Sequence, residues 1–218
     1  MVALFKGVRS FPAFLCALAA FMGCWALKIS PIIGSYCSFF SVADVLTPLA
    51  GCVGLTSIIA LGFTRVSLTV WALQAPFKAL VYHIPGLSAS LGWAYPNVFL
   101  RVVLPILCMV AFCLHPIGSQ AVPYALYWLI PVIIYFSGKK TVFLHALATT
   151  FIAHGVGSVV WLYVKALPVA VWWTLIPVVA VERLSYACIM TAVYYAADLV
   201  MHGRKSFVAQ QFAFEKIL

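Results

Sequence analysis

The chain has 218 residues, of which 66% are hydrophobic and only 8% are charged, and its mean hydropathy is +1.12. Soluble domains carry about 25% charged residues, so this composition excludes an ordinary soluble protein and predicts a polytopic membrane protein. The net charge is +9, but the basic residues stand at the ends of apolar runs, where they act as topology signals and lipid contacts. We therefore expect no nucleic-acid partner and one integral membrane domain over residues 1–218.

Six apolar runs predict an all-α, six-helix transmembrane bundle. They lie near residues 11–33, 42–63, 98–114, 121–136, 141–164 and 169–200, and a helix needs about 20 apolar residues to cross a bilayer. Residues 66–97 between them contain Gln74, Pro76 and Lys78, followed by HIPGLSASLGWAYPN, which is rich in helix breakers. We expect this segment to be re-entrant or interfacial rather than a seventh span.

The distribution of Lys and Arg supports six spans with both termini in the cytoplasm. With the N-terminus inside, ten basic residues are cytoplasmic: Lys6, Arg9, Arg65, Lys78, Arg101, Lys139, Lys140, Arg204, Lys205 and Lys216. Only Lys28 and Lys165 then face outward, as the positive-inside rule requires. A seventh span at 66–97 would move Lys139 and Lys140 to the outside.

Polar residues inside the last two spans are the first candidates for a functional site. Thr150, His154 and Ser158 follow one another at intervals of four, so they form one stripe on a helix. Glu182 and Arg183 lie well inside an apolar run, where a charge costs several kcal/mol unless it is paired or faces water or protein. Either a ligand site or a polar clamp between helices accounts for this group, and the partner expected for Glu182 is His154 or Arg183.

Other polar residues are candidates at the ends of the spans. Asp44 is either a helix N-cap or a contact at the mouth of a site. The aromatic residues near the outer ends form either an interfacial belt or a stacking pocket for a flat heterocycle, with Asn97, His115, Gln120 and His154 as polar anchors. No CxxC pair occurs and His145 does not share a helical face with His154, so we expect neither a metal nor a cofactor.

In layout, the chain resembles the substrate-binding S components of energy-coupling-factor (ECF) vitamin transporters. The resemblance rests on about 200 residues in six spans, the ridge of small residues in the first helix, SVADVLTPLAG at 41–51, FIAHGVGSVVWLY, and LIPVVAVERL at 175–184. It implies that Ala13, Ala17, Ala20 and Gly23 dock onto a transmembrane coupling subunit, although small residues also serve packing against a neighbouring helix of the same chain.

The resemblance further implies a protein of the bacterial inner membrane that captures a vitamin-like micronutrient and performs no chemistry. A separate pair of ATPases would supply the energy. The expected substrate-binding residues are His154, Ser158, Glu182, Arg183, Asp44, Asn97 and Gln120, and Arg183 suits a ligand carboxylate as well as it suits Glu182.

Two other functions stay open at this point. An intramembrane enzyme would use His154 as general base with Ser158 or Glu182. A proton-coupled carrier would relay protons between His154 and Glu182.

Overall fold

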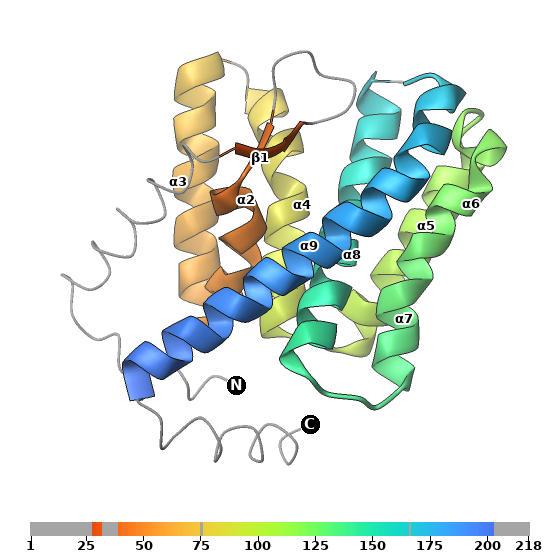
Figure 1. Ribbon diagram of the computed structural model, residues 1–218. Coiled ribbons are helices and arrows are strands. Elements are labelled where there is room, and N and C mark those ends of the chain that lie inside the picture. Colours follow the sequence, from red (N-terminus) through yellow and green to blue (C-terminus); the bar gives the residue numbers. More distant parts are fainter. Residues whose placement is uncertain (1–27, 32–38, 75, 166, 203–218) are drawn as a thin grey trace.

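The computed structural model describes residues 28–31, 39–74, 76–165 and 167–202. The predicted first helix, with its docking residues Ala13, Ala17, Ala20 and Gly23, lies outside these ranges. The described chain is a helical bundle with one two-stranded hairpin, as Figure 1 shows. The all-α fold class expected from the sequence is therefore confirmed, whereas the number of membrane spans stays a prediction.

The first described elements form a short limb that enters the bundle. Strand β1 (Lys28–Pro31) pairs antiparallel with β2 (Phe39–Ser41). Helix α2 (Val42–Leu46) follows directly and continues into the 3-10 helix η1 (Thr47–Cys52). Gly54 then takes a φ of 119°, which favours glycine, and the chain turns into the next helix.

A helical hairpin occupies the part of the chain where a re-entrant segment was expected. Helix α3 (Leu55–Leu73) ends at Gln74, which adopts a left-handed conformation with φ 52°, and α4 (Pro76–Ala94) begins immediately afterwards. Pro76 is tolerated because it stands in the first turn, where no helical N–H partner is required. The span expected over 42–63 is thus divided between α2, η1 and α3. Helix α4 continues through most of HIPGLSASLGWAYPN, the sequence that is rich in helix breakers.

The next part consists of shorter, broken helices. The π-helix η2 (Phe99–Val103) leads into α5 (Leu104–Leu114), and the turn η3 (Gly118–Gln120) reverses the chain. The descending limb contains α6 (Val122–Ala125), the 3-10 turn η4 (Leu126–Trp128) and α7 (Leu129–Phe136). Pro123 and Pro131 within this limb remove backbone donors, which is consistent with its division into short pieces.

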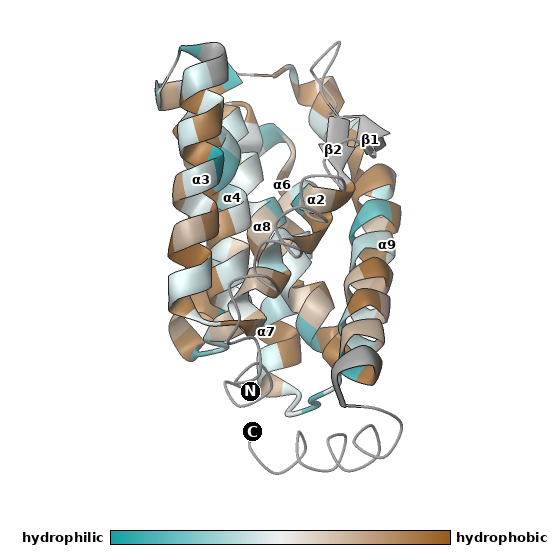
Figure 2. Ribbon diagram, turned by 90° about the vertical axis from the view of Figure 1, so that its left-hand side faces the viewer, coloured by the Kyte–Doolittle hydropathy of each residue, from teal (hydrophilic) through white to brown (hydrophobic). Residues whose placement is uncertain are grey.

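Two helices close the fold and, among the residues that the structure describes, are the two that could span a membrane by length and composition. Helix α8 (Val142–Lys165) and helix α9 (Val169–His202) are long and apolar enough to cross a membrane. Shorter apolar helices in the described residues are Val42–Cys52, Leu55–Trp71, Phe99–Leu114 and Val122–Phe136. On α3 the side chains of Ile59, Phe63 and Trp71 are 61%, 74% and 77% exposed, and on α9 Val181 is 68% exposed. Figure 2 shows hydrophobic residues, in brown, along both helices. Lipid, rather than water, is the natural surrounding for such a surface.

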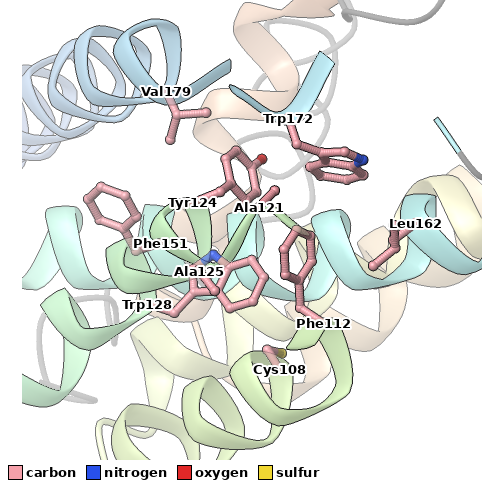
Figure 3. Close-up of a cluster of buried hydrophobic side chains, with 10 residues drawn as sticks. All are labelled: Cys108, Phe112, Ala121, Tyr124, Ala125, Trp128, Phe151, Leu162, Trp172 and Val179. Carbon is pink, nitrogen blue, oxygen red and sulfur yellow. The ribbon is translucent and has the colours of Figure 1, made fainter. Parts of the chain in front are cut away.

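An aromatic cluster holds α5, α6, η4, α8 and α9 together. The ring of Phe112 lies 5.6 Å from Tyr124, 5.3 Å from Trp128 and 5.1 Å from Trp172, measured between centroids. Figure 3 shows these rings gathered around Ala121 and Ala125. All four aromatic side chains are at most 2% exposed, so they fix the positions of the helices on which they stand.

Arg65 and Arg101, which were expected in cytoplasmic loops, are buried inside helices at 7% and 3% exposure. The guanidinium of Arg101 donates to the carbonyl oxygen of Gly92 at 2.9 Å, to that of His145 at 3.3 Å and to Thr149 Oγ1 at 3.0 Å. These acceptors come from α4 and α8. Arg101 therefore ties η2 to both helices, and hydrogen bonds of this kind satisfy a cation that would otherwise be costly to bury.

Helix α4 lies very close to η1, and Gly51 makes this approach feasible. A Cβ built on Gly51 would stand 2.5 Å from the carbonyl oxygen of Ser90 and 2.9 Å from the amide nitrogen of Ala94. Both are backbone atoms of α4, which cannot rotate away. The hydroxyl of Ser90 also donates to the carbonyl oxygen of Thr47 at 3.0 Å, across the same contact.

We predict that Gly51→Ala destabilises the fold by about 1–3 kcal/mol, because the added methyl group must push η1 away from α4. Gly62→Ala is the matched control: its Cβ would meet the side chain of Leu87, with the nearest methyl carbon at 2.6 Å, and that side chain can change rotamer. Thermal unfolding of both variants in mild detergent measures the difference. Equal melting temperatures would contradict the close packing of η1 on α4.

Candidate functional site

A cavity of about 200 Å³ lies between α2, η1, α3 and α4 on one side and α6, α8 and α9 on the other. Five of the seven predicted substrate-binding residues line it: Asp44, His154, Ser158, Glu182 and Arg183. They come from α2, α8 and α9, and α2 lies about 100 residues before the other two in sequence. The structure thus brings these five side chains to one place, while their role in binding stays a prediction.

One wall of the cavity is a chain of hydrogen bonds between α6 and α8. The hydroxyl of Tyr124 lies 2.7 Å from Nε2 of His154 and 2.9 Å from Oγ of Ser158. On the other side of the imidazole, Trp128 Nε1 donates to His154 Nδ1 at 3.0 Å. His154 and Ser158 stand one helical turn apart on α8, as the sequence spacing indicated, and Tyr124 bridges them.

The partners of His154 determine which of its nitrogens carries hydrogen. An indole N–H can only donate, so Nδ1 must accept from Trp128. The neutral imidazole then carries its hydrogen on Nε2 and donates it to the Tyr124 oxygen. A second ring hydrogen, on Nδ1, would point at the Trp128 N–H. The surroundings therefore favour the neutral ring.

A second wall is an ion pair on α9. Nη2 of Arg183 lies 2.5 Å from Oε2 of Glu182, and the hydroxyl of Tyr186 donates to Oε1 of the same carboxylate at 2.9 Å. The guanidinium carbon of Arg183 is 4.6 Å from the centre of the Tyr186 ring. Of the two partners expected for Glu182, Arg183 is the one that the structure places against it.

A second ion pair stands on the opposite wall. Nη2 of Arg65, on α3, forms a hydrogen-bonded ion pair with Asp44 on α2, and Nη1 donates to Thr47 Oγ1 at 2.5 Å. Beside them, Nε2 of His83 lies 2.7 Å from the hydroxyl of Thr69, which joins α4 to α3. Asp44 is thus a contact between α2 and α3 in addition to lining the cavity.

Apolar and aromatic side chains complete the lining. Trp161 and Trp172 contribute rings from α8 and α9, and Tyr82 of α4 meets Trp161 edge to face at 5.3 Å. Lys165 stands at the C-terminal end of α8, with its ammonium group 4.6 Å from the centre of the Trp161 ring. This arrangement combines flat hydrophobic surfaces with a few polar groups, as small-molecule sites do.

The remaining predicted residues lie elsewhere. Asn97 is exposed and accepts a hydrogen bond from the backbone N–H of Leu100, in the first turn of η2, at 3.0 Å. Gln120 is exposed in the η3 turn, and its amide donates to the carbonyl oxygen of Pro116 at 2.9 Å. Neither lines the cavity. Within the part of the chain that the structure describes, no group of three His, Cys, Asp or Glu side chains could hold a metal ion.

Sequence reasoning missed several polar members of the site, among them Arg65, His83 and Tyr124. Arg65 was interpreted as the cytoplasmic end of a span, and His83 fell in the segment expected to be interfacial. Tyr124 was assigned to the aromatic belt or pocket without a polar role. The sequence does mark Tyr124 and Arg65 as candidates, because each is a polar residue close to an apolar run. Residue spacing cannot show, however, which residues on different helices contact one another.

Comparison with known proteins adds no relative: no protein-family model, curated protein or solved structure matches this chain. The function must therefore be argued from the cavity and its surroundings.

We predict that Tyr124→Phe destabilises the protein by about 1–3 kcal/mol, because two buried partners, His154 and Ser158, lose their hydrogen bond. The measurement is again thermal unfolding in detergent. Tyr135→Phe is the control, since Tyr135 is 38% exposed and stands on α7 away from the cavity. A Tyr124→Phe variant as stable as the control would show that the hydrogen-bond chain is not formed.

Proposed function

We propose that this chain is a polytopic membrane protein that captures a small, flat heterocycle and acts as the substrate-binding subunit of an ATP-driven micronutrient uptake system. The observation that carries the proposal is the cavity, which joins two ion pairs, a neutral hydrogen-bond chain and tryptophan rings inside an apolar bundle. If these polar residues only held the helices together, their hydrogen bonds and ion pairs would be needed but the cavity between them would not.

The size of the cavity supports a compact ligand. An engineered apolar cavity of roughly 150 Å³ binds benzene, so about 200 Å³ suits a ligand of one or two rings. Trp161 and Trp172 offer faces and edges for stacking. A carboxylate on the ligand would find Lys165 at the Trp161 end of the cavity, whereas Arg183 already pairs with Glu182.

The arrangement of the helices supports a topology for capture from outside. The α7–α8 connection, with Lys139 and Lys140, lies at the same end of the bundle as the C-terminal end of α9, and the turn after Lys165 lies at the opposite end (Figure 1). The positive-inside rule makes the first end cytoplasmic. Lys165 and the hairpin β1–β2 then face outward, in the bacterial inner membrane.

In this topology, α2 and η1 carry the chain inward, and six further limbs cross the bilayer. These six are α3, α4, η2 with α5, α6 with α7, α8 and α9. The sequence predicted a single inward crossing over residues 42–63. In this topology the chain instead runs inward through α2 and η1, outward through α3 and inward through α4. Lys139 and Lys140 therefore stay on the cytoplasmic side.

The cavity gives less support to the other two functions. An enzyme with His154 as general base needs an accessible unprotonated nitrogen near its nucleophile. In the structure Nδ1 is covered by Trp128, and Tyr124 separates Nε2 from Ser158. A proton relay through His154 meets the same obstacle at Nδ1. The proposed partners are accordingly the small-molecule substrate, a transmembrane coupling subunit, a pair of ATPases and membrane lipid.

We predict that a small heterocycle co-purifies with the protein in mild detergent, because a tight uptake site retains its ligand through purification. Native mass spectrometry of the complex would give the ligand's mass. Ala153→Leu, which places a larger side chain in the cavity, serves as a control that should carry no ligand. No bound compound, together with no thermal shift from a panel of vitamins, would contradict the proposal.

We also predict that Ala153→Leu abolishes ligand binding without loss of stability. Ala153 lines the cavity, so a larger apolar side chain fills the space that the ligand needs, and filled cavities tend to stabilise proteins. Ala60→Leu, on the exposed surface of α3, is the matched control. Binding and cellular uptake should fall by at least tenfold in the first variant only. Unchanged uptake in Ala153→Leu would exclude this cavity as the substrate site.

A further inference from the structure

The hydrogen-bond chain at the cavity wall has a direction that follows from its first member. Trp128 Nε1 donates to His154 Nδ1, so the imidazole donates from Nε2 to the oxygen of Tyr124. The Tyr124 hydroxyl has then received one hydrogen bond and has its own hydrogen left to give. Its only other partner in the described chain is Oγ of Ser158, at 2.9 Å. Every hydrogen in the chain therefore points from Trp128 toward Ser158.

Ser158 ends this chain with a hydroxyl hydrogen still to donate. Other hydroxyls within helices give theirs to carbonyl oxygens of their own helix: Thr149 to His145 at 2.8 Å, Thr150 to Leu147 at 2.8 Å and Ser185 to Val181 at 2.8 Å. The one hydrogen bond that Ser158 makes within the described residues is with Tyr124, where it accepts. Its side chain is buried, at 6% exposure, and lines the cavity.

A buried hydroxyl that lacks an acceptor is costly, and a ligand can remove that cost. We propose that Ser158 donates a hydrogen bond to an acceptor atom of the ligand, a ring nitrogen or a carbonyl oxygen, and that Trp128 fixes this polarity from outside the cavity. The inference rests on the proposed function, because it specifies the substrate class of the same site.

Trp128 acts as a positioning residue, since it does not line the cavity and is fully buried in the aromatic cluster. If the indole N–H is removed, His154 can carry its hydrogen on Nδ1 and accept on Nε2. Tyr124 would then donate to His154 and accept from Ser158, and Ser158 would present only a lone pair to the cavity. Replacing Trp128, which lies outside the cavity, would thus change Ser158 from a hydrogen-bond donor to the ligand into an acceptor.

The surroundings narrow the ligand class further. The carboxylates of Asp44 and Glu182 are engaged by Arg65 and Arg183, so neither ion pair requires a charged ligand for neutrality. The edge of the ligand that meets Ser158 is therefore a neutral acceptor, and the faces of its ring system meet tryptophan and apolar side chains. Planar heteroaromatic compounds with a ring nitrogen or a ring carbonyl fit this description.

The first experiment determines the tautomer of His154 directly. Nitrogen NMR of the purified protein labelled with ¹⁵N-histidine distinguishes a protonated from an unprotonated ring nitrogen, and His154→Gln identifies the signal. The expected result is a neutral ring with hydrogen on Nε2 in the unchanged protein and a shift of population toward Nδ1–H in Trp128→Phe. Hydrogen on Nδ1 in the unchanged protein would overturn the inference, whatever the cavity binds.

The second experiment tests polarity with two bicyclic probes, quinoline, which only accepts hydrogen bonds, and indole, which only donates. Binding is measured by ligand-observed NMR, and the signal from Ala153→Leu is subtracted to remove partitioning into detergent. We expect quinoline to bind about tenfold more tightly than indole, which corresponds to one hydrogen bond to a buried group. Ser158→Ala should abolish the preference, and Trp128→Phe should abolish or reverse it. Ser185→Ala, which removes a hydroxyl bonded to its own helix, should leave it unchanged.

The outcomes separate this inference from the proposed function. Equal binding of the two probes, no binding of either, or a quinoline preference that survives Ser158→Ala would overturn the polarity assignment. A co-purified ligand lost in Ala153→Leu would still support an uptake site in each of those cases. Failure of both the ligand search and the Ala153→Leu test would overturn the proposed function itself.

Discussion

Charges buried in an apolar bundle must be paired or hydrogen-bonded by near neighbours, and two ion pairs at the cavity meet this requirement. Arg183 has Glu182 beside it in the same helix, so that pair forms wherever α9 forms. Arg65 depends instead on Asp44, which lies 21 residues earlier in the sequence. The α2–η1 limb must therefore return alongside α3 before Arg65 can be accommodated. Burial of Arg65 therefore requires the α2–η1 segment, which also forms one wall of the cavity, to lie in this position.

The neutral part of the site follows a different rule. His154, Tyr124 and Ser158 carry no net charge, and they are joined by hydrogen bonds that leave only the Ser158 hydroxyl with a hydrogen to donate. Trp128 makes the arrangement unambiguous because its N–H can only donate. The same indole packs against Phe112 in the aromatic cluster at 5.3 Å. Correct packing of that cluster is consequently linked to the hydrogen-bond pattern at the cavity surface, although the two lie on different sides of the imidazole.

Sequence reasoning reached the helical class and much of the site, because both depend on local signals. Ionisable residues such as Glu182 and Arg183 stand out inside an apolar run, and the spacing of His154 and Ser158 places them on one helical face. The hairpin of α3 and α4 was missed because Pro76, Gly86 and the flanking polar residues weaken the apolar signal. Tertiary packing overrides that weakness: α4 lies against α3, η1 and α8, so its small residues face neighbours. Pairings such as Arg65 with Asp44 are set by this packing, and no pattern within either segment reveals them.

The close approach of α4 to its neighbours has a consequence for how such a chain can diverge. Gly86 lies against Thr47, whose methyl carbon would stand 3.3 Å from an added Cβ, and Gly157 lies against Pro85 at 3.4 Å. Gly51 leaves no room for a larger side chain against the backbone of α4, and Gly86 leaves little room against Thr47. Ligand specificity can change through Trp161 or Ser158, while Gly51 and Gly86 are held by the close approach of neighbouring atoms. Proteins that share this fold but bind other compounds should thus differ most in the cavity lining and least along the surfaces of α4.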